Sequence, residues 1–253
     1  ARPLRMLLSM QMIVAFAAGA TVMFYFQRSW FPVITTTIEQ LPRQARWDHR
    51  LLQWPTQPKP AALAHNPLAA IVLDWSLSGR AGQLSDVQVE FGSTHWRVRS
   101  LLGYSEFHYA EGRFELENAI VKPAWEAWKP AGLAFVGITA AIGIFCSWIL
   151  LATLGAPIAK LIGFFANRDL SLGQAWKLCG AALMPGAIVF TIALVLYSIL
   201  RLNLFGLLLA FVIHLSLDLF YMLLAPCRLP KKAAIASPLI PPANPFRSPN
   251  TEA

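Results

Sequence analysis

Long apolar segments and one long polar stretch divide this chain. A helix needs about 20 mostly apolar residues to cross the hydrocarbon core of a bilayer. Four segments reach that length: Met6 to Phe26, Ala131 to about Leu154, about Leu178 to Leu200, and about Leu204 to Leu224. The pattern predicts four transmembrane helices. Because only residues 201–203 separate the last two, we expect these two to form a tight antiparallel hairpin.

The polar stretch between the first and second spans shows strand patterns in its second half. "AAIVLDW" is an apolar run of strand length, and "DVQVEF" alternates, which puts Val87, Val89 and Phe91 on one face. "HWRVR" also alternates after the loop "GST", and "FHY" and "RFEL" flank "AEG"; both loops suit hairpins. We expect a small antiparallel sheet of four or five strands, preceded by a short helix at 38–52 and an extended proline-rich linker.

These patterns predict a polytopic α-helical membrane protein with four transmembrane helices and a small β-rich extracytoplasmic domain. We assign residues 1–30 to the N-terminal tail and first transmembrane helix, and residues 31–128 to the extracytoplasmic domain. Residues 129–226 hold transmembrane helices two to four, with a cytoplasmic loop at 156–177. Residues 227–253 are rich in proline, so we expect a disordered cytoplasmic tail.

Composition and charge support the membrane assignment. Apolar residues make up 56% of the chain and charged residues 13%, against about 25% charged in a typical soluble domain. The net charge is +8, but basic and acidic residues nearly cancel between the first two spans. The excess lies in the tails and the internal loop, a pattern typical of membrane orientation rather than of nucleic-acid binding. The protein is therefore expected in the bilayer of a bacterial-type inner membrane, with both termini cytoplasmic.

The ends of the spans carry further orientation signals. Arg2 and Arg5 precede the first span, which resembles a secretory signal but continues to Phe26. We therefore favour an uncleaved signal-anchor, although cleavage stays open. Tryptophans are expected in belts at the two interfaces, with Trp30, Trp125 and Trp128 at the outer one and Trp148 and Trp176 at the inner one.

Helix-shaping signals occur in the second and third spans. In "SLGQAW", Ser171 and Gln174 match a capping box that begins the third helix before the membrane. Pro185 and Gly186 interrupt the same helix, so we expect a kink there. In the second span, small residues permit close contact with another helix, within the chain or between copies: Gly137, Ala141 and Gly143.

The fourth span contains the sharpest chemical feature of the sequence. His214 and Asp218 are four residues apart, so they share one helical face. An intramembrane charge costs about 2.5–3.5 kcal/mol even on insertion scales, so such residues normally face a bundle interior or a wet cavity. Folding the hairpin about residue 202 places Asp218 level with Gly186, and His214 level with Phe190.

Two interpretations of this pair remain. Pro185 leaves the carbonyl of Ala181 without its usual helical partner, and Asp218 or His214 could donate to it and hold the two helices together. Alternatively, the pair is a proton relay or substrate site of a transporter. Two ligands do not define a metal site.

Other titratable residues give no catalytic pattern. His95 and His108 lie in predicted strands near Glu90 and Glu106, without metal-binding spacing. The three cysteines fall in or beside apolar segments and show no zinc or redox spacing: Cys146, Cys179 and Cys227. We find no phosphate-binding loop or nucleophile elbow. No metal, cofactor, nucleic acid or catalytic residue is expected.

The segment "DLSLGQAWKLCGAALMPG" resembles the start of a membrane helix in Yip1-like proteins, through Ser171, Gln174, Trp176, Lys177 and Pro185. The overall plan is similar to that of bacterial membrane proteins linked by name to maltodextrin utilisation. This resemblance implies a membrane-organising or accessory role without catalytic residues. The chain has fewer spans than a complete Yip1-type bundle.

The leading functional hypothesis is a non-enzymatic accessory or assembly protein that recruits partners, or a second copy, through its outer domain and helix faces. A small proton-coupled transporter or permease subunit that uses Asp218 and His214 is the alternative. A membrane enzyme acting on lipid or cell-wall precursors is the third hypothesis, and it lacks a polar cluster in the sequence.

Overall fold

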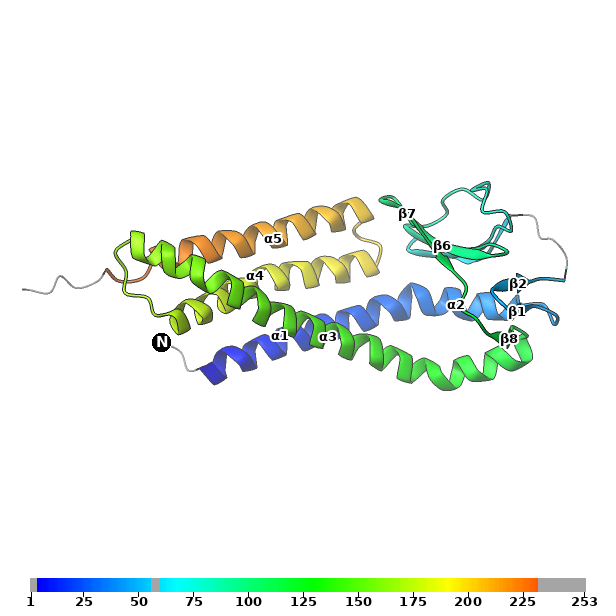
Figure 1. Cartoon of the computed structure of the whole chain (residues 1–253), viewed down its shortest axis with the longest axis horizontal. Helices are drawn as coiled ribbons and strands as arrows, with labels where there is room; N and C mark the ends of the chain where they lie inside the picture. Colours follow the sequence, from blue (N-terminus) through cyan, green and yellow to red (C-terminus); the bar gives the residue numbers. More distant parts are fainter. Residues whose placement is uncertain (1–3, 56–59, 232–253) are drawn as a thin grey trace, which may run out of the picture.

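The computed structural model describes residues 4–55 and 60–231. Its helices are α1 (Leu4–Arg28), α2 (Trp30–Glu39), α3 (Asn118–Phe165), α4 (Leu172–Ser198) and α5 (Leu204–Cys227). Its strands are β1 (Arg46–Asp48), β2 (Leu51–Gln53), β3 (Ala61–His65), β4 (Ala69–Leu73), β5 (Val87–Phe91), β6 (His95–Ser100), β7 (Gly103–His108) and β8 (Arg113–Glu115). The strands and their loops, residues 46–115, are called the β domain below. It lies at one end of an elongated helical bundle (Figure 1).

Within the described residues, four helical segments are long and apolar enough to cross a membrane. They are α1 continued by α2, then α3, α4 and α5. Successive long helices run in opposite directions along the bundle (Figure 1). The prediction of four helices long and apolar enough to cross a membrane, with a small sheet region, is therefore confirmed, and the topology stays a prediction. The uncleaved signal-anchor stays a prediction, and residues 232–253 of the predicted disordered tail lie outside the described residues.

Small side chains let the helices approach closely. Ala152, Ala156 and Ala159 of α3 pack against Ala175 and Cys179 of α4, and all five are almost fully buried. Helices α3 and α4 each contact all the other long helices, so together they form the centre of the bundle. Small residues, rather than large apolar ones, therefore occupy the positions where the helix backbones meet, as is usual between membrane helices.

Helix α3 is longer than the sequence predicts at both ends. Its 48 residues correspond to about 72 Å at 1.5 Å per residue. It begins inside the predicted outer domain and continues to Phe165, so residues 166–171 form the connection to α4. The cytoplasmic placement of residues 156–177 stays a prediction. The extension is stabilised because Ala156, Ala159 and Gly163 are buried against α4 and the residues before it.

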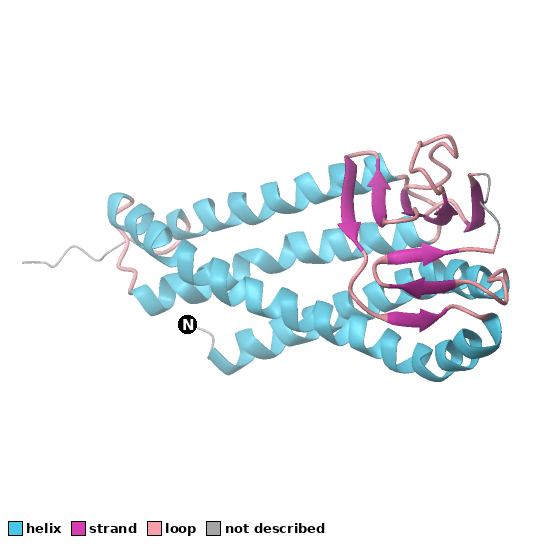
Figure 2. Cartoon of the chain, turned by 45° about the vertical axis from the view of Figure 1, so that its right-hand side comes forward, coloured by secondary structure: helices cyan, strands magenta, loops and turns pink. Residues whose placement is uncertain are grey.

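The β domain contains two sheets rather than one antiparallel sheet. The larger has strand order β3-β4-β5-β6-β7, and the smaller has order β2-β1-β8. The hairpin around "GST" is confirmed, with β5 and β6 antiparallel, but β4 and β5 are parallel. The predicted hairpin around "AEG" is wrong, because β7 pairs with β6 while β8 pairs with β1 (Figure 2).

The predicted helix at 38–52 is also wrong. The helix of this region is α2, which begins at Trp30 directly after α1 and ends at Glu39. Pro42 follows within three residues, and a proline disfavours helical backbone in the residue before it. Residues 46–53 instead form β1 and β2. The predicted extended linker includes residues 56–59, which lie outside the described residues.

Polar contacts fix the β domain on the bundle. The hydroxyl of Tyr197, at the end of α4, donates to Asp86 Oδ2 over 2.8 Å. The side-chain amide of Asn66 donates to the Ser29 carbonyl, between α1 and α2, over 2.7 Å. The domain is thus attached at two points to the helix ends beneath it.

Candidate functional site

The structure contains the predicted capping box at the start of α4. The Ser171 side chain accepts from the Gln174 backbone N–H, and the Gln174 side chain accepts from the Ser171 backbone N–H. Helix α4 then continues through Pro185 and Gly186 to Ser198 as one helix. The kink at Pro185 stays a prediction.

Two of the three small residues named for helix packing lie in a helix contact. Gly137 and Ala141 of α3 are buried against α1, where a Cβ on Gly19 would lie 2.6 Å from the Gly137 carbonyl and 3.0 Å from the Ala141 Cβ. Gly143 lies on an exposed face with nothing within 4 Å of its Cβ position among the described residues. The small-residue motif therefore serves a contact within the chain.

The His214–Asp218 pair lies between α5 and α4, at the level that hairpin geometry predicts. The two side chains approach to 3.3 Å between Nδ1 and Oδ2. A Cβ at Gly186 would contact Asp218 Oδ1 and would come within 2.7 Å of His214 Nδ1. The imidazole stacks on Phe190, with ring centroids 5.8 Å apart. Glycine at 186 therefore makes room for the pair against the α4 backbone.

The polar pair is only partly satisfied. His214 Nδ1 and Asp218 Oδ1 are buried without a hydrogen-bond partner in the described part of the chain. These atoms therefore do not make the bond to the Ala181 carbonyl that the sequence suggests. Asp218 is 7% exposed, so its carboxyl group is held among apolar helices with one titratable neighbour.

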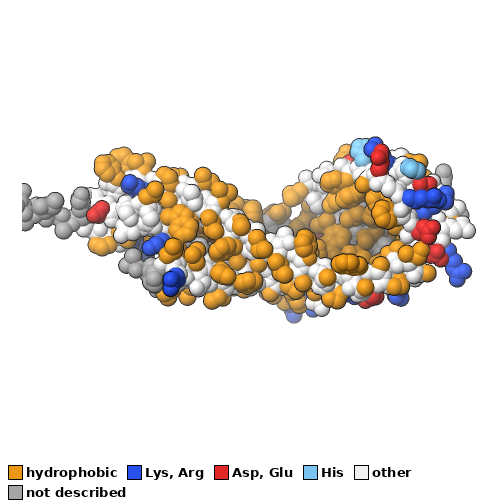
Figure 3. Space-filling model, turned by 60° about the horizontal axis from the view of Figure 1, so that its bottom comes forward, with side chains coloured by type: hydrophobic (Ala, Val, Ile, Leu, Met, Phe, Trp, Pro, Cys, Tyr) orange, Lys and Arg blue, Asp and Glu red, His pale blue; other side chains and the backbone are white. Residues whose placement is uncertain are grey.

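The β domain contains a large apolar cavity that the sequence does not reveal. Its volume is about 660 Å³, within the range of about 300–1,000 Å³ typical of ligand pockets. Almost all of its surface is apolar. Its walls come from α2, from both sheets and from the first turns of α3, and the β domain is visibly hollowed on this side (Figure 3). Five tryptophans line it: Trp30, Trp47, Trp54, Trp125 and Trp128.

Strand alternation explains why this cavity is apolar. On β4 and β5, Ile71, Leu73, Val89 and Phe91 line the cavity, while the intervening residues point to the other face of the sheet. Helix α2 contacts β3 and β4 and covers part of the same face. The Trp125 indole N–H donates to Thr35 on α2 over 3.0 Å, which ties the start of α3 to the opposite wall.

Few polar groups approach the cavity. Thr37 Oγ1 and Trp47 Nε1 belong to lining residues and are buried without a hydrogen-bond partner among the described residues. Tyr109 is buried beside Trp47, with ring centroids 5.3 Å apart, and its hydroxyl donates to the Gly92 carbonyl over 2.9 Å. Burial raises the pKa of the Tyr109 phenol above its usual range, so the phenol stays neutral.

The opposite face of the same sheet carries a buried ion cluster. Glu90 is fully buried and forms ion pairs with Arg97 and with Arg99, the latter at 3.3 Å. The Gln88 amide donates to Glu90 over 2.7 Å and to the Gly82 carbonyl over 2.9 Å. The cluster therefore joins β5 and β6 to the loop that crosses from β4 to β5.

Two histidines of this domain, His95 and His108, lie on the strands β6 and β7 beside the cluster. His95 and His108 face each other across β6 and β7, with ring centroids 6.1 Å apart, and His95 Nε2 is 3.9 Å from Glu106. No group of three or more metal-ligating side chains occurs among the described residues. The three cysteines are all free thiols. Catalytic or metal chemistry here therefore has no further support from the geometry.

Sequence reasoning missed both the cavity and the full ion cluster. The cluster has a signal, because opposite charges at Glu90 and Arg97 are in register across the predicted "GST" hairpin. The cavity has a weaker sequence signal. The predicted aromatic belt places three of its tryptophans together at the outer interface: Trp30, Trp125 and Trp128. Trp148, by contrast, is 3% exposed among the bundle helices and does not face an interface.

The chain has no significant match among protein-family models, curated proteins or solved structures. The resemblance of residues 169–186 to Yip1-like proteins therefore stays a prediction. The functional conclusion rests on the geometry of the chain itself.

Proposed function

We propose that the protein is a non-enzymatic membrane accessory protein whose β domain binds one apolar chain, of a lipid or of a lipid-bearing partner. The cavity of about 660 Å³ with its nearly continuous apolar lining is the observation that carries this proposal. In this proposal the β domain is extracytoplasmic, since basic residues gather at the opposite end of the bundle.

The chemistry of the lining favours an acyl chain over a peptide. A peptide segment brings an N–H and a carbonyl with every residue, and each polar group buried without a partner is unfavourable. The accessible lining offers almost no polar surface to satisfy such groups. An acyl chain brings only apolar surface and gains about 0.8 kcal/mol for each buried methylene group.

The position of the cavity also favours a membrane lipid. Its walls include α2 and the first turns of α3, which continue directly from α1 and into the apolar part of α3. Leu101 and Leu102 form the turn between β6 and β7 and are 64% and 78% exposed. This hairpin is on the side of the β domain that faces the α4–α5 turn (Figure 1). Such a turn suits contact with a bilayer surface and keeps the cavity close to it.

Native mass spectrometry after mild extraction tests this function. We expect one lipid, or one lipid-bearing partner, to remain bound to the wild-type protein. Val89→Trp fills the cavity and should reduce the bound fraction at least tenfold. Arg113→Trp is the control, because Arg113 is exposed on β8 and lies outside the lining.

The mass of the bound species distinguishes the two sources of the chain. A phospholipid mass indicates a free lipid, and a larger conjugate indicates a lipid-bearing partner. If the folded wild type retains nothing, or if Val89→Trp retains as much as Arg113→Trp, the proposal is wrong.

A proton-coupled transporter is the second candidate, because Asp218 has a buried oxygen without a hydrogen-bond partner beside His214. Proton flux into liposomes containing the protein would then fall strongly with Asp218→Asn. We rank it second because the pair lines neither the β-domain cavity nor the cavity at the opposite end of the bundle. Equal flux in the two proteins would exclude this role.

A further inference from the structure

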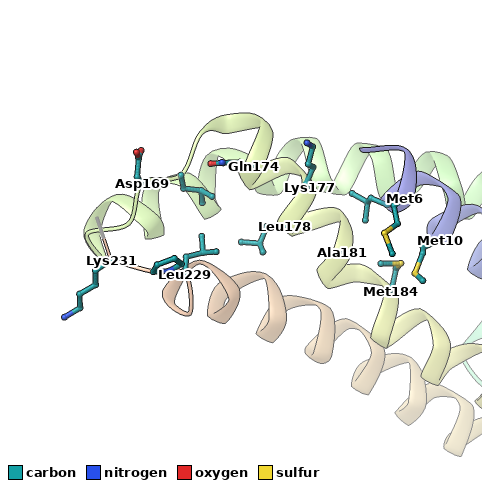
Figure 4. Close-up of a pocket in the computed structure, with 13 residues that line it drawn as sticks. Met6, Met10, Asp169, Gln174, Lys177, Leu178, Ala181, Met184, Leu229 and Lys231 are labelled. Carbon is teal, nitrogen blue, oxygen red and sulfur yellow. The ribbon is translucent and has the colours of Figure 1, made fainter. Parts of the chain in front are cut away.

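A second large cavity lies at the end of the bundle opposite the β domain. Its volume is about 790 Å³. Its lining comes from the first turns of α1, from α4 and from the segment after α5 (Figure 4). Helix α4, which contacts α1, lines the cavity from Gln174 to Met184. We call this cavity the α4 groove.

One part of the α4 groove is apolar and adaptable. Met6 and Met10 of α1 converge with Met184 of α4 (Figure 4). Leu178 and Ala181 lie between them and the polar end. Methionine side chains are flexible and polarisable, so they adapt to an irregular apolar ligand. This part offers no donor to a polar backbone and suits an acyl chain.

The other part of the α4 groove is polar, and basic residues lie around it. Gln174 and Lys177 lie on the first turns of α4, with Asp169 before that helix and Lys231 after α5. Asp169 is the one carboxylate in the lining. The same end of the bundle carries further basic residues, which give it a positive balance: Arg5, Lys160, Arg168 and Arg228.

A buried hydrogen bond holds α1 beside the groove. Gln11 is 1% exposed, and its side-chain amide donates to the Gly180 carbonyl of α4 over 3.0 Å. A Cβ at Gly180 would lie 3.1 Å from that amide nitrogen, so glycine permits the close approach. The wall formed by α1 is therefore fixed in place, and the groove does not depend on loosely held helices.

We infer that the α4 groove binds one anionic phospholipid, with an acyl chain among the methionines and the headgroup near Lys177 and Gln174. The order of polar and apolar residues along α4 matches the order of headgroup and chain in such a lipid. Basic residues near a membrane surface attract anionic lipids. This site is independent of the β-domain cavity, which lies at the other end of the helices.

The full-length protein in nanodiscs tests this inference with phosphatidylglycerol and phosphatidylcholine as probes. Native mass spectrometry should show one phosphatidylglycerol retained in preference to phosphatidylcholine. Lys177→Gln should weaken phosphatidylglycerol retention by about fivefold, the effect of about one interfacial cation. Lys122→Gln is its control, because Lys122 is exposed near the opposite end of α3 and lies outside the lining.

Ala181→Phe gives a second test that does not depend on charge. The larger side chain fills the groove, so retention of phosphatidylglycerol should be lost, whereas Ala134→Phe on an exposed face of α3 should leave it unchanged. Thermal unfolding of each variant shows whether it is folded. Equal retention of the two lipids by the wild type, or retention unaffected by Ala181→Phe, would overturn the inference.

The source of the occupant is resolved by a photo-crosslinking amino acid placed at Leu178. We expect an adduct with the mass of a phospholipid. An adduct with residues 232–253 of the same chain, or with a second copy, would instead show that protein fills the groove and would overturn the proposal.

Discussion

The β domain and the helical bundle each bury a carboxylate, but the two carboxylates differ in how many partners surround them. In the β domain, fully buried Glu90 has two arginines and a glutamine around it. These groups occupy one face of the sheet, which leaves the other face and its cavity apolar. In the bundle, Asp218 has His214 beside it and an oxygen without a hydrogen bond, in a contact so close that Gly186 leaves no space for a Cβ.

Because of this difference, we expect different functions in the two regions. The buried charge of Glu90 is already paired on the opposite face of the sheet, so the β-domain cavity can accept an apolar chain without leaving that charge unpaired. The bundle pair has titratable groups but little space around them. Binding is therefore expected in the β domain, and a structural or proton-related role is expected at Asp218.

Removal of the buried carboxylate should have the largest effect on stability. Glu90→Ala leaves Arg97 buried without its partner, and breaking a buried ion pair costs about 3–5 kcal/mol. Limited proteolysis within the β domain, followed by mass spectrometry, should show this loss of stability. The control is Arg50→Ala, because the Arg50–Glu111 pair is exposed, and exposed pairs contribute about 0–1 kcal/mol. Similar protease resistance in the two variants would contradict the importance of the cluster.

A methyl group at the helix contact should have the next effect. Gly186→Ala places a Cβ against Asp218 and His214, and overpacking of this kind costs about 1–3 kcal/mol. Thermal unfolding in detergent measures it against Gly143→Ala, whose Cβ meets nothing within 4 Å among the described residues. If Gly186→Ala is as stable as Gly143→Ala, α4 and α5 do not approach as closely at Gly186 as described.

Loss of the helix cap should have a smaller effect. Ser171→Ala removes the side-chain acceptor of the capping box, which is worth about 1 kcal/mol. Ser147→Ala is the comparison, since that hydroxyl only donates back to the Ile144 carbonyl within its own helix. We expect a lower unfolding temperature for the first variant and little change for the second. The opposite order would show that the cap does not stabilise the start of α4.

Neutralisation of Asp218 should have the smallest structural effect. Asparagine has nearly the same shape and can donate a hydrogen bond, so Asp218→Asn should fold in normal yield if the pair holds the helices together without charge. Size-exclusion chromatography of the extracted variant measures the folded yield. A collapse of that yield would show that the carboxyl group itself is required.

Local patterns in the sequence predict much of this fold. The length of each apolar run identifies the four spans, the three residues after Leu200 specify the α4–α5 hairpin, and alternation identifies β5 and β6. The capping box at Ser171 is equally local. The hairpin also places Asp218 beside Gly186, because a tight turn fixes the register of two antiparallel helices.

Features that depend on distant segments are not visible in the sequence. Pairing of β1 with β8 joins residues near 47 to residues near 114, and no short pattern specifies it. The β-domain cavity combines Ile38, Val89 and Trp125 from three separate segments. Each looks like an ordinary core residue by itself, and only the fold leaves an unfilled space among them.

Photo-crosslinking with phospholipids that carry a diazirine on the acyl chain tests the central claim most directly. After illumination of membranes that contain the protein, adducts are located by peptide mass spectrometry. Binding in the cavity predicts adducts on its lining residues in α2, β5 and the first turns of α3, and their loss in Val89→Trp. Adducts confined to the outer faces of the membrane-spanning helices, with none in the β domain, would contradict it.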